Sequence, residues 1–343
     1  MIKEAIAKLS NLESIEFAGA AQAMTEIMNG EATPAQIGAF LVALRIKGES
    51  IEEISGCAHV MREKAEKVEL GNIEALDIVG TGGDGANTFN ISTCSAFIVS
   101  AAGIPVAKHG NRSVSSKCGS ADVLEALGTN INLSPQAAAA CLQQTGLCFM
   151  FAPGYHKSMK FAAGPRRELG LRTIFNILGP LVNPARVSSQ LLGVCDENLV
   201  EPLTKALINL GVRNIMTVYS RDGLDEFSLS APTLVYESRQ GMMKSYVLNP
   251  ESLGLKMCSL SEVRGGEAVE NAEIIEGILS GDLEGPKKDI VLLNSAAALY
   301  LTGKAATIEN GLQLASRIIK EGKARAQLSA YRQISNRFKE LTV

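Results

Sequence analysis

Residues 75–85 read ALDIVGTGGDG, a short and mainly apolar run followed by a glycine-rich turn, and this stretch decides the fold of the 343-residue chain. No strand pattern precedes it. Capping boxes at residues 33–36 and 50–53 instead begin helices that carry apolar stripes. After it, apolar runs alternate with helical patterns, which is typical of α/β proteins with a parallel sheet. The sequence therefore predicts a small helical unit over residues 1–70, followed by an α/β core.

Several later segments carry the strand and helix signals of this core. Strands are predicted at residues 104–107, 147–151, 190–194 and 214–219, with helices at 92–102 and 199–210 and helix caps at Ser120 and Ser134. Residues 233–248 predict a hairpin that turns at Arg239-Gln240-Gly241, and the pattern from residue 271 onward is helical. The fold class predicted is α/β, with a largely parallel central sheet.

The charge of the chain is low overall but unevenly distributed. It has 33 Lys and Arg against 36 Asp and Glu, and 46% of its residues are hydrophobic. These values exclude a disordered chain and argue against a generally basic nucleic-acid binder. Residues 85–167, however, contain seven Lys and Arg and only two acids, Asp122 and Glu125. A cationic segment in a slightly acidic protein indicates a compact anionic ligand.

Neither a secretory signal nor a membrane span is predicted. The N-terminus lacks the basic-then-apolar layout of a signal peptide, and polar residues, Pro and Gly interrupt the uncharged stretch 126–156. The seven cysteines include no CxxC pair, which indicates small core residues in a reducing cytosol rather than disulfides or a zinc site. We therefore expect a cytoplasmic protein with no membrane and no nucleic-acid partner.

The glycine-rich turn at 80–85 matches GxGxxG, but a dinucleotide site is disfavoured. That site expects an acid about 20 residues further on, and no acid lies between Asp84 and Asp122. A phosphate site fits better, because glycines let backbone N–H groups approach an anion. Residues 90–93 then begin a helix, whose N-terminus also favours an anion. The alternative is an ordinary glycine-rich turn with a polar cap.

Two further loops follow predicted strands, where open α/β sheets bind ligands. Residues 108–116, KHGNRSVSS, offer two cations and three hydroxyls one helix away from the first loop, which together favour a polyphosphate site. In residues 220–226, Asp225 and Glu226 are suited to Mg²⁺, which prefers one or two carboxylates and shares itself with substrate phosphates. The alternatives are a solvated basic turn and a turn with surface acids.

A fourth segment, residues 152–160, leads to Arg166 and Arg167. The forked guanidinium of Arg166 is suited to a substrate carboxylate, and His156 can line the same pocket. His59 lies on a helix far from these loops and is interpreted as a packing or surface residue. This segment therefore predicts a second, carboxylate-bearing substrate.

Together these pieces resemble the anthranilate phosphoribosyltransferase family, within the wider group of nucleoside phosphorylase relatives. The resemblance spans nearly the whole chain and is carried by GTGGD (80–84), NIST (90–93), KHGNRSVSSKCGSAD (108–122), FAPGYHKSMK (151–160), RTIFNILGPLVNPA (172–185) and DGLDE (222–226). It implies a small all-helical domain, residues 1–70 completed by about 166–182, packed on a larger α/β domain formed by residues 71–165 and 183–343. It also implies a homodimer through the helical parts, and it leaves open an association with anthranilate synthase.

The resemblance implies transfer of the phosphoribosyl group of 5-phosphoribosyl 1-pyrophosphate (PRPP) to the amine of anthranilate. The products are N-(5-phosphoribosyl)anthranilate and pyrophosphate, in the second committed step of tryptophan biosynthesis. By the same resemblance, PRPP is bound by Gly80, Gly83, Asp84, Thr88, Asn90, Ile91, Ser92, Thr93, Lys108, His109, Gly110, Asn111, Arg112, Ser113, Val114, Ser115, Ser116 and Ser120. Anthranilate is contacted by Gly80, Asn111, Arg166, His109 and His156, and Mg²⁺ is held by Ser92, Asp225 and Glu226.

Two departures from the family pattern lie near the expected anthranilate channel. The family commonly has His-Pro-Ala where this chain has His156-Lys157-Ser158, and Pro-Val-Arg or Pro-Leu-Arg where it has Gly164-Pro165-Arg166. Arg166 keeps its distance from His156, so its expected role is unchanged. The shape of the channel is where a difference is expected.

The expected reaction needs no covalent nucleophile and no strong base. An aromatic amine is neutral at pH 7, and displacement at the anomeric carbon passes through an oxocarbenium-like state. Positioning and stabilisation of the departing pyrophosphate are expected to supply catalysis. Two rivals are a pyrimidine nucleoside phosphorylase, against which RTIFNILGPLVNPA argues, and a non-catalytic nucleotide- or nucleic-acid-binding relative, against which NIST and DGLDE argue.

Overall fold

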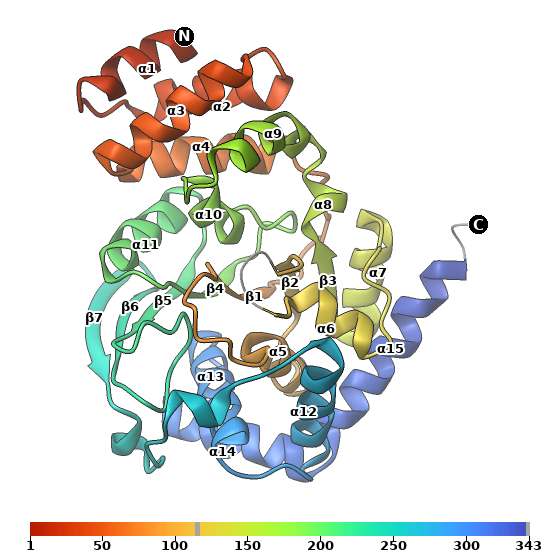
Figure 1. Cartoon of the computed structure of the whole chain (residues 1–343). Helices are drawn as coiled ribbons and strands as arrows, with labels where there is room; N and C mark the ends of the chain where they lie inside the picture. The colour runs from red at the N-terminus through yellow and green to blue at the C-terminus, as the bar shows by residue number, and fades with distance from the viewer. Residues whose placement is uncertain (114–116, 341–343) are drawn as a thin grey trace.

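The chain begins with a purely helical segment. The structure, a computed structural model, describes residues 1–113 and 117–340. Its first helices are α1 (Ile2–Ser10), α2 (Phe17–Asn29), α3 (Pro34–Lys47) and α4 (Ile51–Lys64). Both predicted capping boxes are confirmed: Thr33 Oγ1 accepts from Gln36 N and Ser50 Oγ from Glu53 N, each at 3.3 Å. These four helices form the upper layer in Figure 1.

A single seven-stranded sheet follows within the described residues, in the order β3-β2-β1-β4-β5-β6-β7. The strands are β1 (Leu76–Gly80), β2 (Val106–Gly110), β3 (Leu147–Phe151), β4 (Ser189–Gly193), β5 (Asn214–Ser220), β6 (Thr233–Arg239) and β7 (Met242–Leu248). The pairs from β3 to β5 are parallel, and β6 and β7 add an antiparallel edge. The predicted fold class, α/β with a largely parallel sheet and a small helical part, is therefore confirmed.

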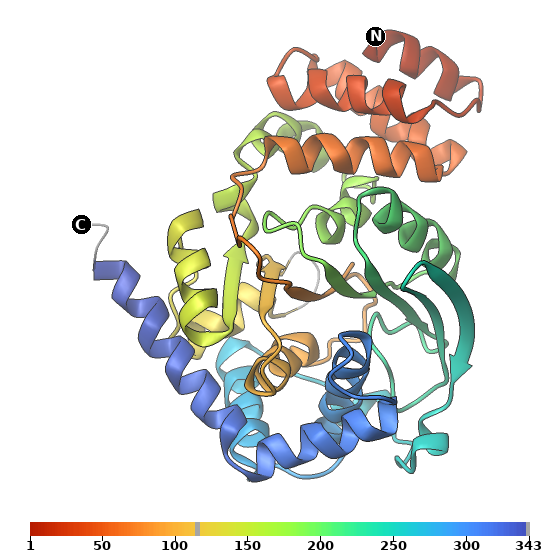
Figure 2. The same cartoon turned by 180° about the vertical axis from the view of Figure 1, so that it is seen from behind.

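Helices cover both faces of the sheet. On one face α5 (Ile91–Ala101) contacts β1, β2 and β3, and α13 (Pro286–Leu301) packs on α5. On the other face α11 (Val200–Asn209) packs on β5 and β6 and also contacts α4. Figure 2 shows the same layers from behind, with β7 at the outer edge. The remaining helices are α6 (Ser120–Ala126), α7 (Pro135–Thr145), α8 (Ala152–Tyr155), α9 (Lys160–Leu169), α10 (Phe175–Leu178), α12 (Ala268–Ser280), α14 (Ile308–Lys320) and α15 (Lys323–Glu340).

Alternate strand residues feed two apolar clusters. Leu191 and Met216 belong to the cluster on the α5 side, whereas their neighbours Leu192 and Ile215 belong to the cluster on the α11 side. This is the period of two expected of strands buried on both faces. The second cluster continues without a break through α10 into α1–α4.

The structure tests two local predictions, the hairpin turn at residues 239–241 and the helix cap at Ser120. The hairpin turns at Gln240 and Gly241, both with positive φ, 53° and 77°, as a two-residue turn between twisted strands requires. The prediction that Ser120 caps a helix is wrong: Gly119 is the N-cap, and its N–H donates to Asp122 Oδ2 at 2.9 Å. The Ser120 hydroxyl instead donates to the carbonyl of Asn111 at 3.2 Å.

The uncharged stretch 126–156 forms α7, β3 and α8 against the core. Cys141 and Cys148 are buried within it, and all seven cysteines of the chain are free thiols. Within residues 1–113 and 117–340, no helix is both long and apolar enough to cross a membrane.

Segment 160–182 joins the two parts of the molecule. Helix α9 packs on α2 and α3, and α10 packs on α4. From α4, the buried Arg62 donates from Nε to the carbonyl of Leu181 at 2.6 Å and from Nη1 to that of Leu210 at 3.0 Å. The helical part is thus bonded to the end of α11 as well as packed against it.

Candidate active site

The loops after β1, β2 and β5 meet at the carboxyl ends of the parallel strands. Gly80 at the end of β1 and Gly193 at the end of β4 let the β5 loop cross above them. A Cβ at Gly80 would overlap the Asp225 carboxylate, and a Cβ at Gly193 would overlap the Asp225 carbonyl. The close approach at these two glycines brings the acidic loop onto the glycine-rich loop.

Asp225 and Glu226 bridge two of the predicted phosphate loops. Asp225 Oδ2 accepts from Gly82 N at 2.7 Å, and the Glu226 carboxylate accepts from the backbone N–H of Ser92 at the start of α5. The structure therefore brings together Ser92, Asp225 and Glu226, the three residues expected at the metal. Their carboxylate and hydroxyl oxygens are the donor type that Mg²⁺ prefers.

The electrostatics of these acids also fit a divalent cation. Burial raises the pKa of Asp225, and the nearby Asp84 raises that pKa further. Burial is also the main cause that raises the pKa of Glu226, with Asp225 as the second cause. Burial and the mutual repulsion of these carboxylates raise their pKa values. A bound cation would offset this concentration of negative charge.

Lys108 lies beneath the acids rather than free on the loop. Its side chain is 3% exposed, and its Nζ donates to the carbonyl of Ile78 and, at 3.2 Å, to Ser92 Oγ. Burial lowers the pKa of Lys108, while Asp77, Glu226 and Asp225 oppose that shift. The amine therefore offsets part of the acidic charge at the start of α5.

The glycine-rich loop uses some of its amides internally. Thr81 N donates to the carbonyl of Gly193 at 3.0 Å, and Gly82 N is taken by Asp225. Gly82, Gly83 and Gly85 have φ values of 67°, 79° and 69°. The amides that can form the predicted anion nest are therefore those of residues 83–85.

The β2 loop differs from expectation at Arg112. Its guanidinium pairs with Asp122 at 2.7 Å and Glu125 at 2.5 Å, and lies 5.4 Å from the ring centre of Phe151. Arg112 was expected to face phosphate, but the only two acids of the cationic segment face it instead. Ser113 N donates to Asp122 Oδ2 at 3.2 Å. Val114, Ser115 and Ser116, also expected at PRPP, lie outside the described residues.

The start of α5 is held from the side. Asn90 is the N-cap residue, but its side chain makes no capping bond: Nδ2 donates to the carbonyl of Cys118 at 3.1 Å, and Oδ1 accepts from Asn271 Nδ2 at 3.0 Å. Helix residues Ile91 and Thr93 are buried below. Thr88 pairs with Arg264 in an isolated bridge before the helix. The Asn90 side chain thus leaves the amides of the α5 end free of a side-chain cap, and the Ser92 amide is bonded to Glu226.

His109 and His156 form a buried pair, with ring centres 5.1 Å apart. Burial lowers the pKa of His109 well below its usual range and that of His156 to about 4, so both are neutral at pH 7. His109 donates a hydrogen bond to the backbone carbonyl of Gly179, and His156 donates one to the backbone carbonyl of Val182. Each Nε2 is buried without a partner among the described residues, which leaves two acceptor nitrogens.

Arg166 of α9 contacts Phe175 of α10. Its guanidinium lies 4.9 Å from the ring centre of Phe175, and burial lowers its pKa. Of the two departures, Lys157 pairs with Glu66 at 3.1 Å on the surface, and Pro165 is buried inside α9. Gly110 and Asn111 lie beside Ser120 at the β2 end.

Asp77 and Asn183 support the site but were not predicted from the sequence. Asp77 is fully buried and accepts from His109 N at 3.3 Å and from Asn183 Nδ2 at 2.7 Å. Burial raises the pKa of Asp77 to about 6. An acid inside the apolar run LDIV was the available signal, since a buried carboxylate needs such partners.

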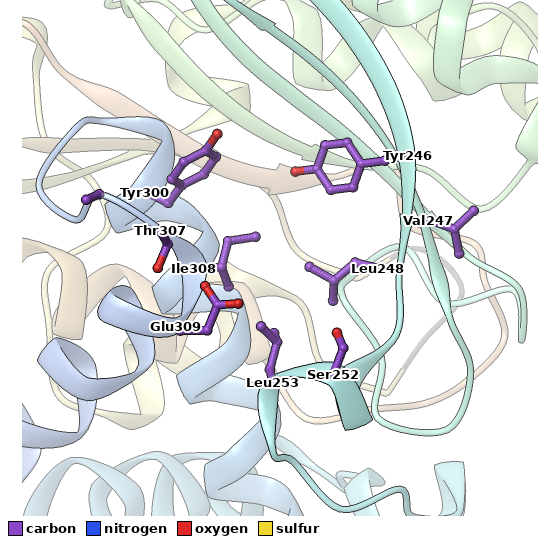
Figure 3. A pocket seen from close by; sticks show the side chains of 10 residues that line it. Tyr246, Val247, Leu248, Ser252, Leu253, Tyr300, Thr307, Ile308 and Glu309 are labelled. Atoms are coloured by element: carbon purple, nitrogen blue, oxygen red, sulfur yellow. The ribbon is translucent and has the colours of Figure 1, made fainter.

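A cavity of about 370 Å³ lies elsewhere, between β7 and the start of α14 (Figure 3). It is lined by Tyr246, Val247, Leu248, Ser252, Leu253, Tyr300, Ala306, Thr307, Ile308 and Glu309. The Tyr246 and Tyr300 hydroxyls both donate to Glu237, at 3.1 and 3.0 Å. The cavity shares no residue with the loops described above.

The chain matches two family models, the helical bundle domain of a glycosyl transferase family over residues 3–65 and the a/b domain of that family over residues 72–325. It is 54% identical to anthranilate phosphoribosyltransferases of Ruminiclostridium cellulolyticum and Methanobrevibacter smithii, over 99% and 98% of this chain and 99% and 100% of theirs.

Solved structures agree with these matches. The anthranilate phosphoribosyltransferase of Thermus thermophilus superposes with a TM-score of 0.92 at 38% identity, over 97% of this chain and 99% of that one. The Saccharomyces cerevisiae enzyme in complex with PRPP and Mg gives 0.90 at 28% identity, over 98% of both chains. The chain therefore belongs to the anthranilate phosphoribosyltransferase family.

Proposed function

We propose that the meeting point of the β1, β2 and β5 loops is where this chain, a transferase of tryptophan biosynthesis, performs its reaction. PRPP and anthranilate are the substrates, and N-(5-phosphoribosyl)anthranilate and pyrophosphate are the products. The observation that carries this assignment is the double bridge of the acids, Asp225 to Gly82 and Glu226 to Ser92. It joins a glycine-rich nest, a helix N-terminus and a Mg²⁺-type donor set in one place.

The donor pyrophosphate is proposed to lie between the amides of residues 83–85 and the start of α5. Lys108 adds positive charge from below, and the hydroxyl of Ser92 stands at the helix end. Mg²⁺, held by Ser92, Asp225 and Glu226, supplies positive charge to the departing pyrophosphate. The chain's own donors are fixed before the reaction starts, so they stabilise the charge that develops on the leaving group without reorganising.

Anthranilate is proposed to lie between Arg166 and the histidine pair. Because His109 and His156 are neutral, Arg166 is the cation that matches the carboxylate through its fork. Gly80 and Asn111 complete this site at the ends of β1 and β2. The arrangement leaves the neutral aromatic amine free to attack the anomeric carbon as the C–O bond to pyrophosphate breaks, with inversion, and the anilinium so formed then releases one proton to water.

A homodimer through the helical part belongs to the same proposal. Leu12, Ile46 and Phe161 are exposed on this part, with Ile46 at 70%. Large apolar side chains exposed on the helical part support a protein interface there. Sedimentation velocity should give a dimer, and Ile46→Glu should give a monomer. A monomeric parent chain would contradict the dimer.

Cytoplasmic location and contact with a synthase complete the proposal. The free buried thiols support a reducing compartment. An anthranilate synthase would supply the amine substrate directly, and co-sedimentation of this chain with the purified synthase tests that contact. Separate sedimentation of the two proteins at micromolar concentration would exclude a stable complex.

The reaction itself is tested by following anthranilate fluorescence. The signal should fall only when PRPP and Mg²⁺ are both present, and one pyrophosphate should appear for each anthranilate consumed. Phosphate-dependent cleavage of pyrimidine nucleosides, without loss of anthranilate, would favour the phosphorylase alternative instead.

A further inference from the structure

We propose that Arg172 is a positioning residue for the donor-binding loop, and that Arg45 of the helical part holds Arg172 in place. Neither residue was expected at the substrates. Both lie outside the acids, histidines and amides assigned above. The inference rests on the proposed binding of pyrophosphate by residues 83–85.

Arg172 reaches the glycine-rich loop from the connection between α9 and α10. Its Nη1 donates to the carbonyl of Gly83 at 3.1 Å, and its Nη2 makes a longer contact of 3.5 Å with the carbonyl of Gly82. Nη2 also lies 3.2 Å from the sulfur of Cys195, which follows β4. One exposed guanidinium thus contacts the turn and the strand end beside it.

The contact depends on the glycine at position 83. Its φ is 79°, and a Cβ there would overlap the Arg172 guanidinium. Arg172 contacts the backbone carbonyls of this turn, so their oxygens, which carry partial negative charge, face its guanidinium. The amides of residues 83–85 are thereby left to face an anion, which is the arrangement that a nest requires.

Arg45 links this contact to the helical part. In the last turn of α3, its Nη1 donates to the backbone carbonyl of Arg172. The next residue, Thr173, donates its N–H to Asn176 Oδ1 at 2.9 Å and so fixes the start of α10. The main chain of Arg172 is therefore held on both sides. The helical part therefore contacts the glycine-rich loop indirectly: Arg45 holds Arg172, and Arg172 holds the loop.

Arg172→Ala should weaken PRPP binding and leave anthranilate binding nearly unchanged. Loss of a charge-assisted contact predicts that the KM for PRPP rises about 10-fold to 100-fold. The KM for anthranilate should change by less than about two-fold, because Arg172 is not assigned to that site. Isothermal titration with pyrophosphate and Mg²⁺ should show the same loss without turnover. A purely structural role would change both KM values together.

Arg45→Ala tests the series arrangement. Alone, it should raise the KM for PRPP by a smaller factor, because Arg172 keeps its side chain. In the Arg172→Ala background it should add nothing, since among the described residues Arg45 reaches the loop through Arg172. Additive effects would show that the two arginines act independently and would overturn the coupling.

Two control variants separate this role from general damage. Arg186→Ala removes another arginine that bridges to the helical part, through Glu63 at 2.5 Å, and should leave both KM values unchanged. Cys195→Ala removes the sulfur contact alone and should have little effect. Melting temperatures of all variants should lie close to that of the parent chain, and Arg172→Lys replaces the alanine variant if it does not fold.

The possible failures are distinguishable. If the parent chain does not consume anthranilate, the proposed function falls. If it does, and Arg172→Ala keeps the parent KM for PRPP and the parent affinity for pyrophosphate, only the role of Arg172 falls.

Discussion

Glu226 accepts a hydrogen bond from the backbone N–H of Ser92, the second residue of α5, so an acid occupies a helix N-terminus that also faces the proposed pyrophosphate. Helix N-termini attract anions, and this one therefore offers the same amide end to a fixed carboxylate and to a ligand phosphate. A cation shared between the two removes the repulsion. We therefore expect donor binding to depend on Mg²⁺.

Asp225→Asn and Glu226→Gln should each remove Mg²⁺-dependent turnover. The amides keep the size of the side chains but lose the charge that holds the cation. We expect kcat to fall by about 100-fold or more, as for loss of one well-placed electrostatic group. Steady-state assays over a Mg²⁺ series check this. Glu201→Gln, at a surface acid paired with Lys205 on α11, is the control. An unchanged Mg²⁺ dependence would refute the metal assignment.

Arg166→Ala should act on the other substrate. Its guanidinium is held over Phe175 and is the proposed partner of the anthranilate carboxylate. Loss of a charge-assisted bond predicts a rise of about 10-fold to 100-fold in the KM for anthranilate, with a much smaller change for PRPP. Arg167→Ala, at the exposed neighbour, should match the parent chain. A larger effect on PRPP would place the aromatic substrate elsewhere.

His156 should make the folded state sensitive to acid. Its pKa is about 4 in the fold, because burial disfavours the charged ring, and about 6.5 in the unfolded chain. Between these values the unfolded state binds more protons, so stability falls as the pH drops. From pH 7 to pH 5 this costs about 2 kcal/mol.

His156→Gln should remove that part of the pH dependence. Urea unfolding at pH 7 and pH 5 measures the difference, and the variant should lose less stability than the parent chain. The exposed His59 offers the matched substitution His59→Gln, which should keep the parent slope. Equal slopes for the parent and His156→Gln would show that the buried ring does not titrate as described.

Gly193→Ala should disturb the loop that carries Asp225 and Glu226, although it substitutes no charged side chain. A Cβ there would overlap the main chain of Asp225, which must move away from Gly82. We expect turnover to fall by more than about 10-fold with a weaker Mg²⁺ dependence. Gly38→Ala, in α3 with open space around the Cβ position, should keep full activity. Full activity of Gly193→Ala would mean that the loop tolerates displacement.

Much of the fold was predictable because local signals agree with the tertiary structure. The apolar run at 147–151 is β3, and Gln240-Gly241 makes the hairpin turn. The pairing of Arg112 with Asp122 and Glu125 was not predictable, since it depends on how α6 is oriented against the β2 loop. For the same reason sequence patterns could place the acids after a strand but not show that Glu226 would meet Ser92.

The unbroken apolar cluster beneath α1–α4 has a consequence for how the molecule can be divided. It runs from Leu41 through Phe175 to Leu203 and Leu192, and so crosses the point near residue 70 where sequence patterns change. Cutting the chain there would strip the cover from α9, α10 and the side of α11 that packs on α4. Apolar surface of that extent drives aggregation. The helical part is therefore a piece of a single cooperative unit, and neither half is expected to survive as an independent fragment.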